Sequence, residues 1–165
     1  ISIYESLFEM GSPFGIRDFG GQAFNSMRLE KMYRAYGAEF TEEISALEAG
    51  MDRFLDLSRN FIGSDNIKER QSKGVETQLA YLIFDDEIPA ECFGNEAVFD
   101  GDELSGIITS GAYGYRVSHS VAFAYLNPSH CSEGKTLRVE TSLGSRNCHV
   151  SMNAAYDNDN EKLRS

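Results

Sequence analysis

The sequence predicts an α+β protein in which a mainly helical first part precedes a set of short strands. In the first 73 residues or so, apolar side chains recur at the three- and four-residue spacing of amphipathic helices. From about residue 75 to residue 156, short apolar runs alternate with turn residues. Several such strands in succession are typical of a small barrel or sandwich. We therefore expect two domains, residues 1–73 and residues 74–165.

Two amphipathic helices are expected at the start of the chain. Ser2 and Glu5 form a capping box, which predicts a helix over residues 2–10. A second helix is expected over residues 22–35 and should end at Gly37. Its apolar side chains recur with helical spacing and should form one buried stripe, made of Leu29, Met32, Tyr33 and Tyr36.

The segment before the strands carries a second capping box, formed by Ser45 and Glu48. This pair explains Glu48 as a structural residue. Residues 53–57 have the composition of a strand. Ser64 is expected to cap a third helix over residues 65–72, which has acidic residues at its start and basic residues at its end.

The second part of the chain contains two hairpin signals. Residues 77–84 form a strongly apolar strand, and residues 116–126 form a further extended segment. Hairpin turns are expected at Asp100-Gly101-Asp102 and at Gly144-Ser145. The tail from residue 157 to residue 165 is polar and is expected to fray.

Composition excludes several classes of function. The net charge of −11 repels phosphate backbones, so we expect no nucleic-acid partner. No apolar run is long enough to span a bilayer, so we expect no membrane partner. The three cysteines lack zinc spacing and the three histidines form no helical pair, so we expect reduced thiols and no metal site. No glycine-rich nucleotide fingerprint occurs, which argues against flavin or nucleotide binding by these residues.

Four short motifs occur in order along the chain: Arg28-Leu29-Glu30-Lys31, Leu47-Glu48-Ala49-Gly50, Phe61-Ile62-Gly63 and Thr109-Ser110-Gly111. Together they resemble the aminomethyltransferase family, whose type member is the T protein of the glycine cleavage system. The Arg-Leu-Glu-Lys version is most similar to the C-terminal, folate-binding region of dimethylglycine and sarcosine dehydrogenases. The resemblance implies that residues 1–73 end a folate-binding lobe and that residues 74–165 form the family's C-terminal β-barrel. It implies a strand exit at Thr109-Ser110-Gly111.

The resemblance assigns Glu30 as the carboxylate that binds the pterin ring. An aminopyrimidine edge offers two parallel N–H donors, and a carboxylate accepts both. From spacing alone, the alternative for Glu30 is an exposed ion pair with Arg34, one helical turn further on. Arg28 is expected to orient a carboxylate or to hold the lobe together, and Tyr33 is expected to belong to the core beside the ligand.

Two weaker candidates follow from the same resemblance. Arg59 precedes the Phe-Ile-Gly element, where family members carry a basic residue near the folate tail; the alternative is a solvated loop charge. Tyr113 and Tyr115 are candidates for lining the cleft, and the alternative is an ordinary alternation of barrel residues with one wet face.

The resemblance implies that the parent protein is an enzyme that passes a one-carbon unit from a small N-methyl amine to tetrahydrofolate. The family's catalytic aspartate matches no residue here, so we expect no catalytic residue in this chain and no turnover by it alone. FAD would act only through a domain absent from these residues, so the expected partners include upstream flavin and folate domains of a larger protein. The reduced, acidic composition suits the bacterial cytoplasm or the mitochondrial matrix.

Two other hypotheses about the function stay open. One is a stand-alone glycine cleavage T protein or a folate-dependent demethylase without flavin. The other is a non-catalytic structural or interaction domain that keeps the fold without the chemistry.

Overall fold

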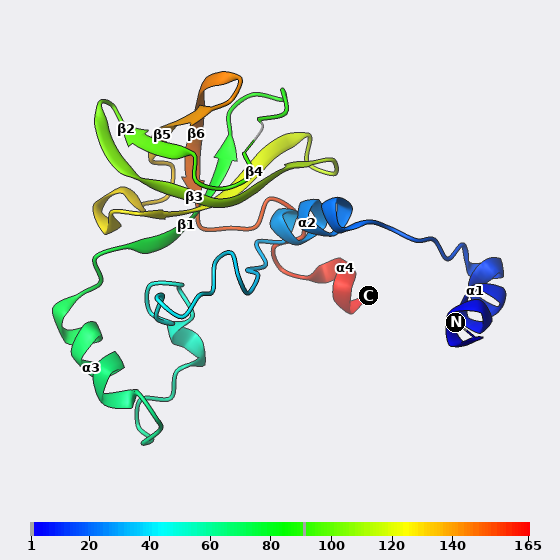
Figure 1. The fold of residues 1–165 in the computed structure, drawn as a ribbon, viewed down its shortest axis with the longest axis horizontal. Helices are drawn as coiled ribbons and strands as arrows, with labels where there is room; N and C mark the ends of the chain where they lie inside the picture. The colour runs from blue at the N-terminus through cyan, green and yellow to red at the C-terminus, as the bar shows by residue number, and fades with distance from the viewer. Residues whose placement is uncertain (1, 91) are drawn as a thin grey trace.

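The computed structural model describes residues 2–90 and 92–165. Its helices are α1 (Ser2–Gly11), α2 (Gly21–Glu30), α3 (Ser64–Lys73) and α4 (Glu161–Arg164), with short 3-10 turns η1 (Ser12–Phe14), η2 (Asp52–Phe54) and η3 (Pro128–His130). Its strands are β1 (Gln78–Phe84), β2 (Ala97–Asp100), β3 (Glu103–Gly114), β4 (His119–Leu126), β5 (Thr136–Thr141) and β6 (Gly144–Ser151). Figure 1 shows α2 against the barrel and α1 on an arm that projects away from it.

The strands form a closed antiparallel barrel in the order β1-β4-β3-β2-β5-β6. Pairing of β1 with β6, from Tyr81 opposite Ser151 to Phe84 opposite Cys148, closes it. The α+β fold with a small antiparallel barrel is therefore confirmed, and the sandwich alternative is wrong. Because β1 and β6 run antiparallel, the chain enters and leaves the barrel at the same end.

Both faces of β1 and β4 are buried, which explains their nearly continuous apolar runs. Alternate residues of these two strands point into the barrel, where they join its interior core: Ala80, Leu82, Phe84, Ala122, Ala124 and Leu126. The residues between them point outward and form a second core with Leu29 of α2: Leu79, Tyr81, Val121, Phe123 and Tyr125. The helix is thus held on the outer wall of the barrel.

Both predicted hairpins exist, and one turn lies two residues earlier than expected. Asp100 pairs with Glu103, so Asp100-Gly101-Asp102 forms the turn as predicted. In the β5–β6 hairpin, Thr141 pairs with Gly144. Gly144-Ser145 therefore begins β6, and residues 142–143 make the turn.

Helix α2 ends at Glu30, so the predicted helix over residues 22–35 is too long. Met32 adopts a left-handed conformation (φ 57°), and the N–H of Tyr33 donates to the carbonyl of Arg28 at 2.7 Å. These features form a Schellman-type helix end, which breaks the expected stripe. Leu29 is fully buried, whereas Tyr33 is 50% exposed and Tyr36 is 82% exposed. Tyr33 is therefore not a core residue, and Gly37 does not end the helix.

Three further local predictions are wrong. Residues 53–57 are not a strand, because Asp52–Phe54 forms the turn η2. Helix α3 begins after Gly63, whose positive φ of 88° sets the entry of the chain, so Ser64 is not its cap. The Thr109-Ser110-Gly111 motif is not a strand exit, since it lies inside β3, where the register against β4 shifts.

The tail after the barrel is also more ordered than expected. Lys31 donates to the carbonyl of Asp157 at 2.5 Å and to its carboxylate at 3.0 Å. It also donates to the side chain of Asn160 at 2.7 Å, just before α4. The first residues of the tail are therefore bound to the end of α2.

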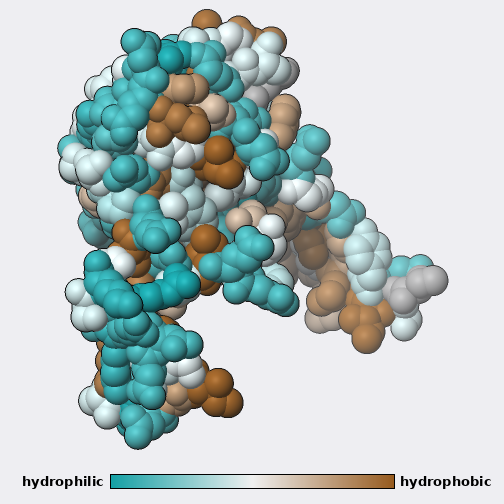
Figure 2. Space-filling model, turned by 60° about the vertical axis from the view of Figure 1, so that its left-hand side comes forward, coloured by the Kyte–Doolittle hydropathy of each residue, from teal (hydrophilic) through white to brown (hydrophobic). Residues whose placement is uncertain are grey.

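Helix α1 is present as predicted, but every described side chain on it is exposed or half-buried. Large apolar side chains cover the arm that carries it: Ile3, Tyr4, Leu7, Met10 and Phe14. Figure 2 shows hydrophobic residues gathered on this projecting arm.

Candidate functional site

The end of α2 places a basic and an acidic side chain on either side of a buried leucine. The Leu29 side chain is fully buried in the outer core, and its carbonyl accepts a hydrogen bond from the Tyr81 hydroxyl at 2.9 Å. Because Leu29 is fixed in this way, Arg28 and Glu30 are held against the barrel in different directions. Each belongs to a separate polar site.

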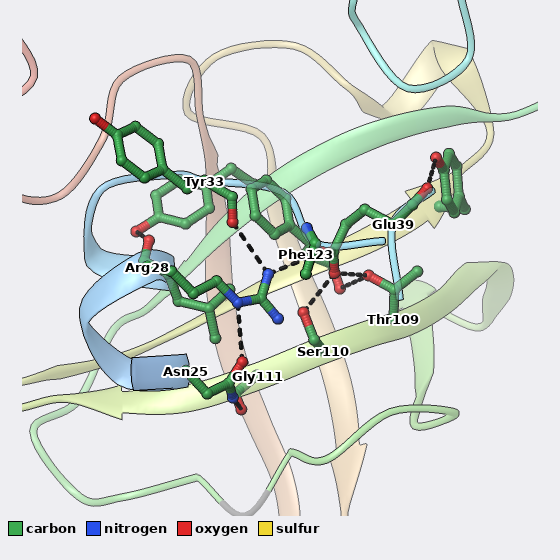
Figure 3. A network of polar contacts seen from close by, with 12 residues as sticks. Asn25, Arg28, Tyr33, Glu39, Thr109, Ser110, Gly111 and Phe123 are labelled. Carbon is green, nitrogen blue, oxygen red and sulfur yellow. Dashed lines mark hydrogen bonds and ion pairs between the residues drawn. The ribbon is translucent and has the colours of Figure 1, made fainter. Parts of the chain in front are cut away.

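Arg28 belongs to what we call the Arg28–Glu39 network, which also contains Asn25, Thr109 and Ser110 (Figure 3). The Arg28 guanidinium donates to the Glu39 carboxylate at 2.8 Å, and Glu39 is fully buried. The hydroxyls of Thr109 and Ser110 donate to the other oxygen of Glu39 at 2.8 and 2.5 Å. The Nε of Arg28 donates to Asn25 at 2.9 Å.

The Glu39 carboxylate is saturated, because the backbone N–H of Ala35 also donates to it at 2.9 Å. Each carboxylate oxygen therefore receives two donors, which uses the acceptor capacity of the group. A buried ion pair with all its hydrogen bonds made is suited to fixing geometry. The network joins α2 and the following loop to β3, and leaves no part of Glu39 for a ligand.

Glu30 is the opposite case. It is 5% exposed, and one oxygen, Oε1, accepts the backbone N–H of Arg116 at 2.6 Å. Among the described residues, no hydrogen bond reaches the other oxygen, Oε2. A methyl group added at Gly114 would lie 3.0 Å from Oε1, so glycine allows the strand to approach the carboxylate. The ion pair with Arg34 is absent among the described contacts, because α2 ends before Arg34.

Glu30 lies at the wall of an open cleft of about 840 Å³, which we call the Glu30 cleft. Its lining comes from α2, from the loop after β3 and from the segment after the barrel: Gln22, Ala23, Ser26, Met27, Glu30, Lys31, Tyr115, Arg116 and Tyr156. The Arg116 guanidinium lies over the Tyr156 ring, 5.2 Å from its centre. The cleft thus combines a fixed carboxylate with aromatic surfaces, which suits a flat ligand that donates hydrogen bonds.

The other candidates are distributed around this site. Tyr113 does not line the cleft itself, but its ring meets the edge of Tyr115, a lining residue, at 5.2 Å between centres. Tyr33 lines a different cleft on the far side of Lys31. Arg59 lines neither cleft; its side chain is 82% exposed and pairs with Asp56 at 3.1 Å, as in the solvated-charge alternative. Arg28 is committed to its network and lines neither cleft.

Sequence reasoning missed four residues of these two sites. Glu39 and Lys31 lie close to Glu30 in sequence, but nothing in their spacing shows that one is buried or that the other binds the tail. Arg116 contributes a backbone N–H, which any residue type would supply. Tyr156 reaches the cleft only because the chain leaves the barrel beside α2, as the hydrogen bond from its N–H to the Glu30 carbonyl shows (3.0 Å).

Within residues 2–90 and 92–165, no group of three or more His, Cys, Asp and Glu side chains is placed to hold a metal ion. All three cysteines are free thiols buried in the protein. Burial raises the pKa of Cys92 and Cys148 to about 12 and that of Cys131 to about 11. No described helix has the length and apolar character needed to cross a membrane.

Comparisons with known proteins match both parts of the chain. Residues 1–59 match the GCVT N-terminal domain, and residues 78–157 match the glycine cleavage T-protein C-terminal barrel domain. Human mitochondrial dimethylglycine dehydrogenase is 34% identical over 143 residues, which cover 85% of this chain and 16% of that protein. An aminomethyltransferase of Corynebacterium aurimucosum is 32% identical over 126 residues, which cover 76% of this chain and 34% of that protein.

The fold also has a counterpart among solved structures. The crystal structure of glycine cleavage system aminomethyltransferase T from Bartonella henselae superimposes with a TM-score of 0.74 at 20% identity. The match covers 82% of this chain and 38% of that one. The chain therefore spans only a minor part of the length of these proteins.

Proposed function

The chain belongs to the glycine cleavage T-protein family of aminomethyltransferases, and on that premise we propose that its Glu30 cleft binds the pterin ring of tetrahydrofolate. Glu30 is the position to which the Arg-Leu-Glu-Lys motif assigns this role. The observation that carries the proposal is that only one of the two Glu30 carboxylate oxygens accepts a hydrogen bond from the described residues.

The residues present fit this ligand. One oxygen of Glu30 is fixed by the N–H of Arg116 at 2.6 Å, which holds the carboxylate plane. An aminopyrimidine edge presents two parallel donors, and charge-assisted pairs of this kind give both affinity and orientation. Tyr115 lines the cleft and offers a flat apolar surface for the ring, and Tyr156 lines it beneath the Arg116 guanidinium and the Lys162 ammonium, each 5.2 Å from its ring centre.

In this proposal the chain binds and orients the folate rather than making or breaking bonds. Glu30 fixes the in-plane rotation of the ring, and the aromatic side chains exclude water from its faces. Tetrahydrofolate, when bound, supplies the nitrogens that accept a one-carbon unit. No residue of this chain matches the family's catalytic aspartate, so we propose that these residues do not catalyse transfer alone.

For the whole protein we propose an FAD-dependent dehydrogenase of the dimethylglycine or sarcosine type, which passes carbon from an N-methyl amine to tetrahydrofolate. The similarity to dimethylglycine dehydrogenase over 85% of this chain supports it. FAD and the amine would bind in other domains of that protein. The division into a lobe of residues 1–73 and a barrel of residues 74–165, and a location in mitochondrial matrix or bacterial cytoplasm, belong to the same proposal.

The test is calorimetric titration of the chain with tetrahydrofolate, in wild type and Glu30→Gln. Glutamine still accepts the Arg116 N–H but carries no charge, so the fold should be kept. Losing a charged hydrogen-bond partner costs about 1.5–3 kcal/mol, so we expect binding weaker by roughly tenfold to hundredfold. Glu103→Gln, which changes an exposed carboxylate at the start of β3, is the matched control and should bind normally. Equal affinity in wild type and Glu30→Gln would refute the assignment.

A further inference from the structure

A second open cleft, which we call the Arg34 cleft, lies beside the first and has a volume of about 490 Å³. Lys31 lines both clefts, so they adjoin at this residue. The wall of the Arg34 cleft carries two arginines, Arg34 and Arg53, among aromatic and methionine side chains that include Tyr33, Phe40, Met51 and Phe54. Nothing in the pterin proposal uses these residues.

Arg34 is held in place without an anion. Its guanidinium lies over the Phe123 ring, 5.8 Å from the ring centre. A methyl group added at Gly50 would lie 3.2 Å from its Nη2, so the backbone passes close to the guanidinium. Its Nε is buried and has no hydrogen-bond partner among the described residues. Buried guanidinium nitrogens are normally paired, so the Arg34 side chain has donor capacity that the described residues do not use.

Arg53 adds a second positive charge to the same wall. It is exposed, and its guanidinium lies over the Phe54 ring, 4.6 Å from the centre. Burial lowers the pKa of the Arg34 guanidinium, and the charge of Arg53 lowers that pKa further, against smaller opposing effects of Tyr125 and Glu39. The two cations therefore repel each other across the cleft wall.

No described carboxylate forms an ion pair with either of these cations. Among the described residues, neither Arg34 nor Arg53 takes part in an ion pair, although the chain carries a net charge of −11. Glu39 is saturated by its own network, and Asp157 is paired with Lys31 at 3.0 Å. Arg34 and Arg53 therefore carry two neighbouring positive charges without ion-pair partners, and a bound anion would stabilise both charges.

We propose that Arg34 and Arg53 form a subsite that binds the carboxylate of an organic ligand. A guanidinium presents a planar fork that matches a carboxylate. The aromatic and methionine walls favour an organic acid over a small inorganic ion, since they contact the carbon part of the ligand. Because it names a second subsite for the ligands of the proposed reaction, this inference rests on the proposed function.

Two ligands of that reaction carry the required group. Tetrahydrofolate has its carboxylates at the end remote from the pterin ring, and the two clefts adjoin at Lys31. An N-methyl amino acid has a carboxylate of its own. The chemistry of recognition is the same in both cases, and binding experiments separate the two sources.

The experiment titrates the chain with two probes, p-aminobenzoylglutamate, which lacks the pterin ring, and dimethylglycine. The variants are Arg34→Gln, Arg53→Gln and, as a matched control, Arg17→Gln, which removes an exposed arginine between η1 and α2 that lines neither cleft. We expect one probe to bind, Arg34→Gln and Arg53→Gln to weaken its binding about tenfold or more, and Arg17→Gln to leave its binding unchanged. The probe that binds identifies the source of the carboxylate.

Three results would overturn the proposal: no binding of either probe by the folded wild-type chain at concentrations on the order of millimolar, binding that neither Arg34→Gln nor Arg53→Gln weakens, or equal weakening by Arg17→Gln. Circular dichroism checks the fold of Arg34→Gln, and Arg53→Gln provides an independent variant because its side chain is exposed. Glu30→Gln separates this proposal from the previous one. It should leave binding of these pterin-free probes intact, whether or not it weakens tetrahydrofolate.

Discussion

Two buried carboxylates close together in sequence, Glu39 and Glu30, lie against the same barrel and have opposite surroundings. Glu39 receives two donors at each oxygen and faces no cleft. Glu30 receives one donor at Oε1 and faces an open cleft. Burial of an acid therefore does not by itself mark a ligand site, whereas unused acceptor capacity at a buried carboxylate does.

At each of the two carboxylates, a tyrosine hydroxyl anchors the backbone. The Tyr125 hydroxyl donates to the backbone carbonyl of Glu39 at 2.7 Å, and the Tyr81 hydroxyl donates to the carbonyl of Leu29, next to Glu30, at 2.9 Å. Each anchor comes from the outward face of β1 or β4. The difference between the sites therefore lies in the side-chain partners and not in how the backbone is attached.

The largest expected effect is on stability in the Arg28–Glu39 network. Glu39→Ala would leave the Arg28 guanidinium buried without its carboxylate, which typically costs about 3–5 kcal/mol. Urea denaturation followed by circular dichroism measures the free energy of unfolding. The double variant Arg28→Met/Glu39→Met is the control, and it should lose less stability than Arg28→Met and Glu39→Met added together. A loss below about 1 kcal/mol for Glu39→Ala would mean that the network is not a structural anchor.

The tyrosine anchors should come next in size. Tyr125→Phe leaves the buried carbonyl of Glu39 without its hydroxyl donor, which costs about 1–3 kcal/mol. Tyr81→Phe should cost less, because the Leu29 carbonyl still accepts the N–H of Met32 at 2.9 Å. Both phenols have a raised pKa, chiefly from burial, so neither should ionise below strongly alkaline pH. Urea denaturation of the two variants measures the difference in the free energy of unfolding. A larger loss for Tyr81→Phe than for Tyr125→Phe would contradict this order.

Glu30→Gln should have the smallest effect on stability of the carboxylate changes, below about 1 kcal/mol, because glutamine keeps the acceptor for the Arg116 N–H. Urea denaturation of Glu30→Gln and Glu39→Gln measures the difference in the free energy of unfolding between the two carboxylate sites. If Glu30→Gln destabilised the chain as much as Glu39→Gln does, Glu30 would be a structural residue like Glu39.

A pH effect is expected where the tail meets α2. The hydrogen bond from Lys31 lowers the pKa of Asp157 below its usual value. The folded pKa is the lower one, so this contribution is complete above the unfolded pKa near 3.9 and is lost as the pH falls through the folded pKa. The protection factors of residues 157–164 against hydrogen exchange should fall at acidic pH, and Asp157→Asn should lower them at neutral pH and remove the dependence. Equal protection in the variant and the wild type at neutral pH would contradict this role.

The strands of the barrel could be predicted because alternation and turn residues are local signals. The run Val121 to Tyr125 and the turn at Asp100-Gly101-Asp102 are examples. The end of α2 could not be predicted, because apolar residues continue past it with helical spacing. A left-handed turn at Met32, a residue type that disfavours this conformation, ends the helix instead, and the tertiary contacts of Leu29 and Arg28 compensate.

The candidate site was predictable only in part for a similar reason. Glu30 stands in a recognisable motif, but its burial and its bond to Arg116 depend on the loop after β3, far along the chain. Glu39 carries no local signal, since its partners Thr109 and Ser110 come from β3. The unpaired state of Arg34 and Arg53 is visible only once every acidic neighbour has been placed.

The shared entry and exit of the barrel has a consequence for modularity. The antiparallel pairing of β1 with β6 closes the barrel and places residues 78 and 151 at the same end. The barrel is therefore connected to the rest of the chain at that end alone. A unit of this kind can be cut and rejoined elsewhere, so a circular permutant with new ends in the turn at residues 142–143 should keep the barrel. Lys31 at the end of α2 pairs with Asp157 after β6, so a transplanted barrel would carry the Glu30 cleft only if α2 and the segment after β6 came with it.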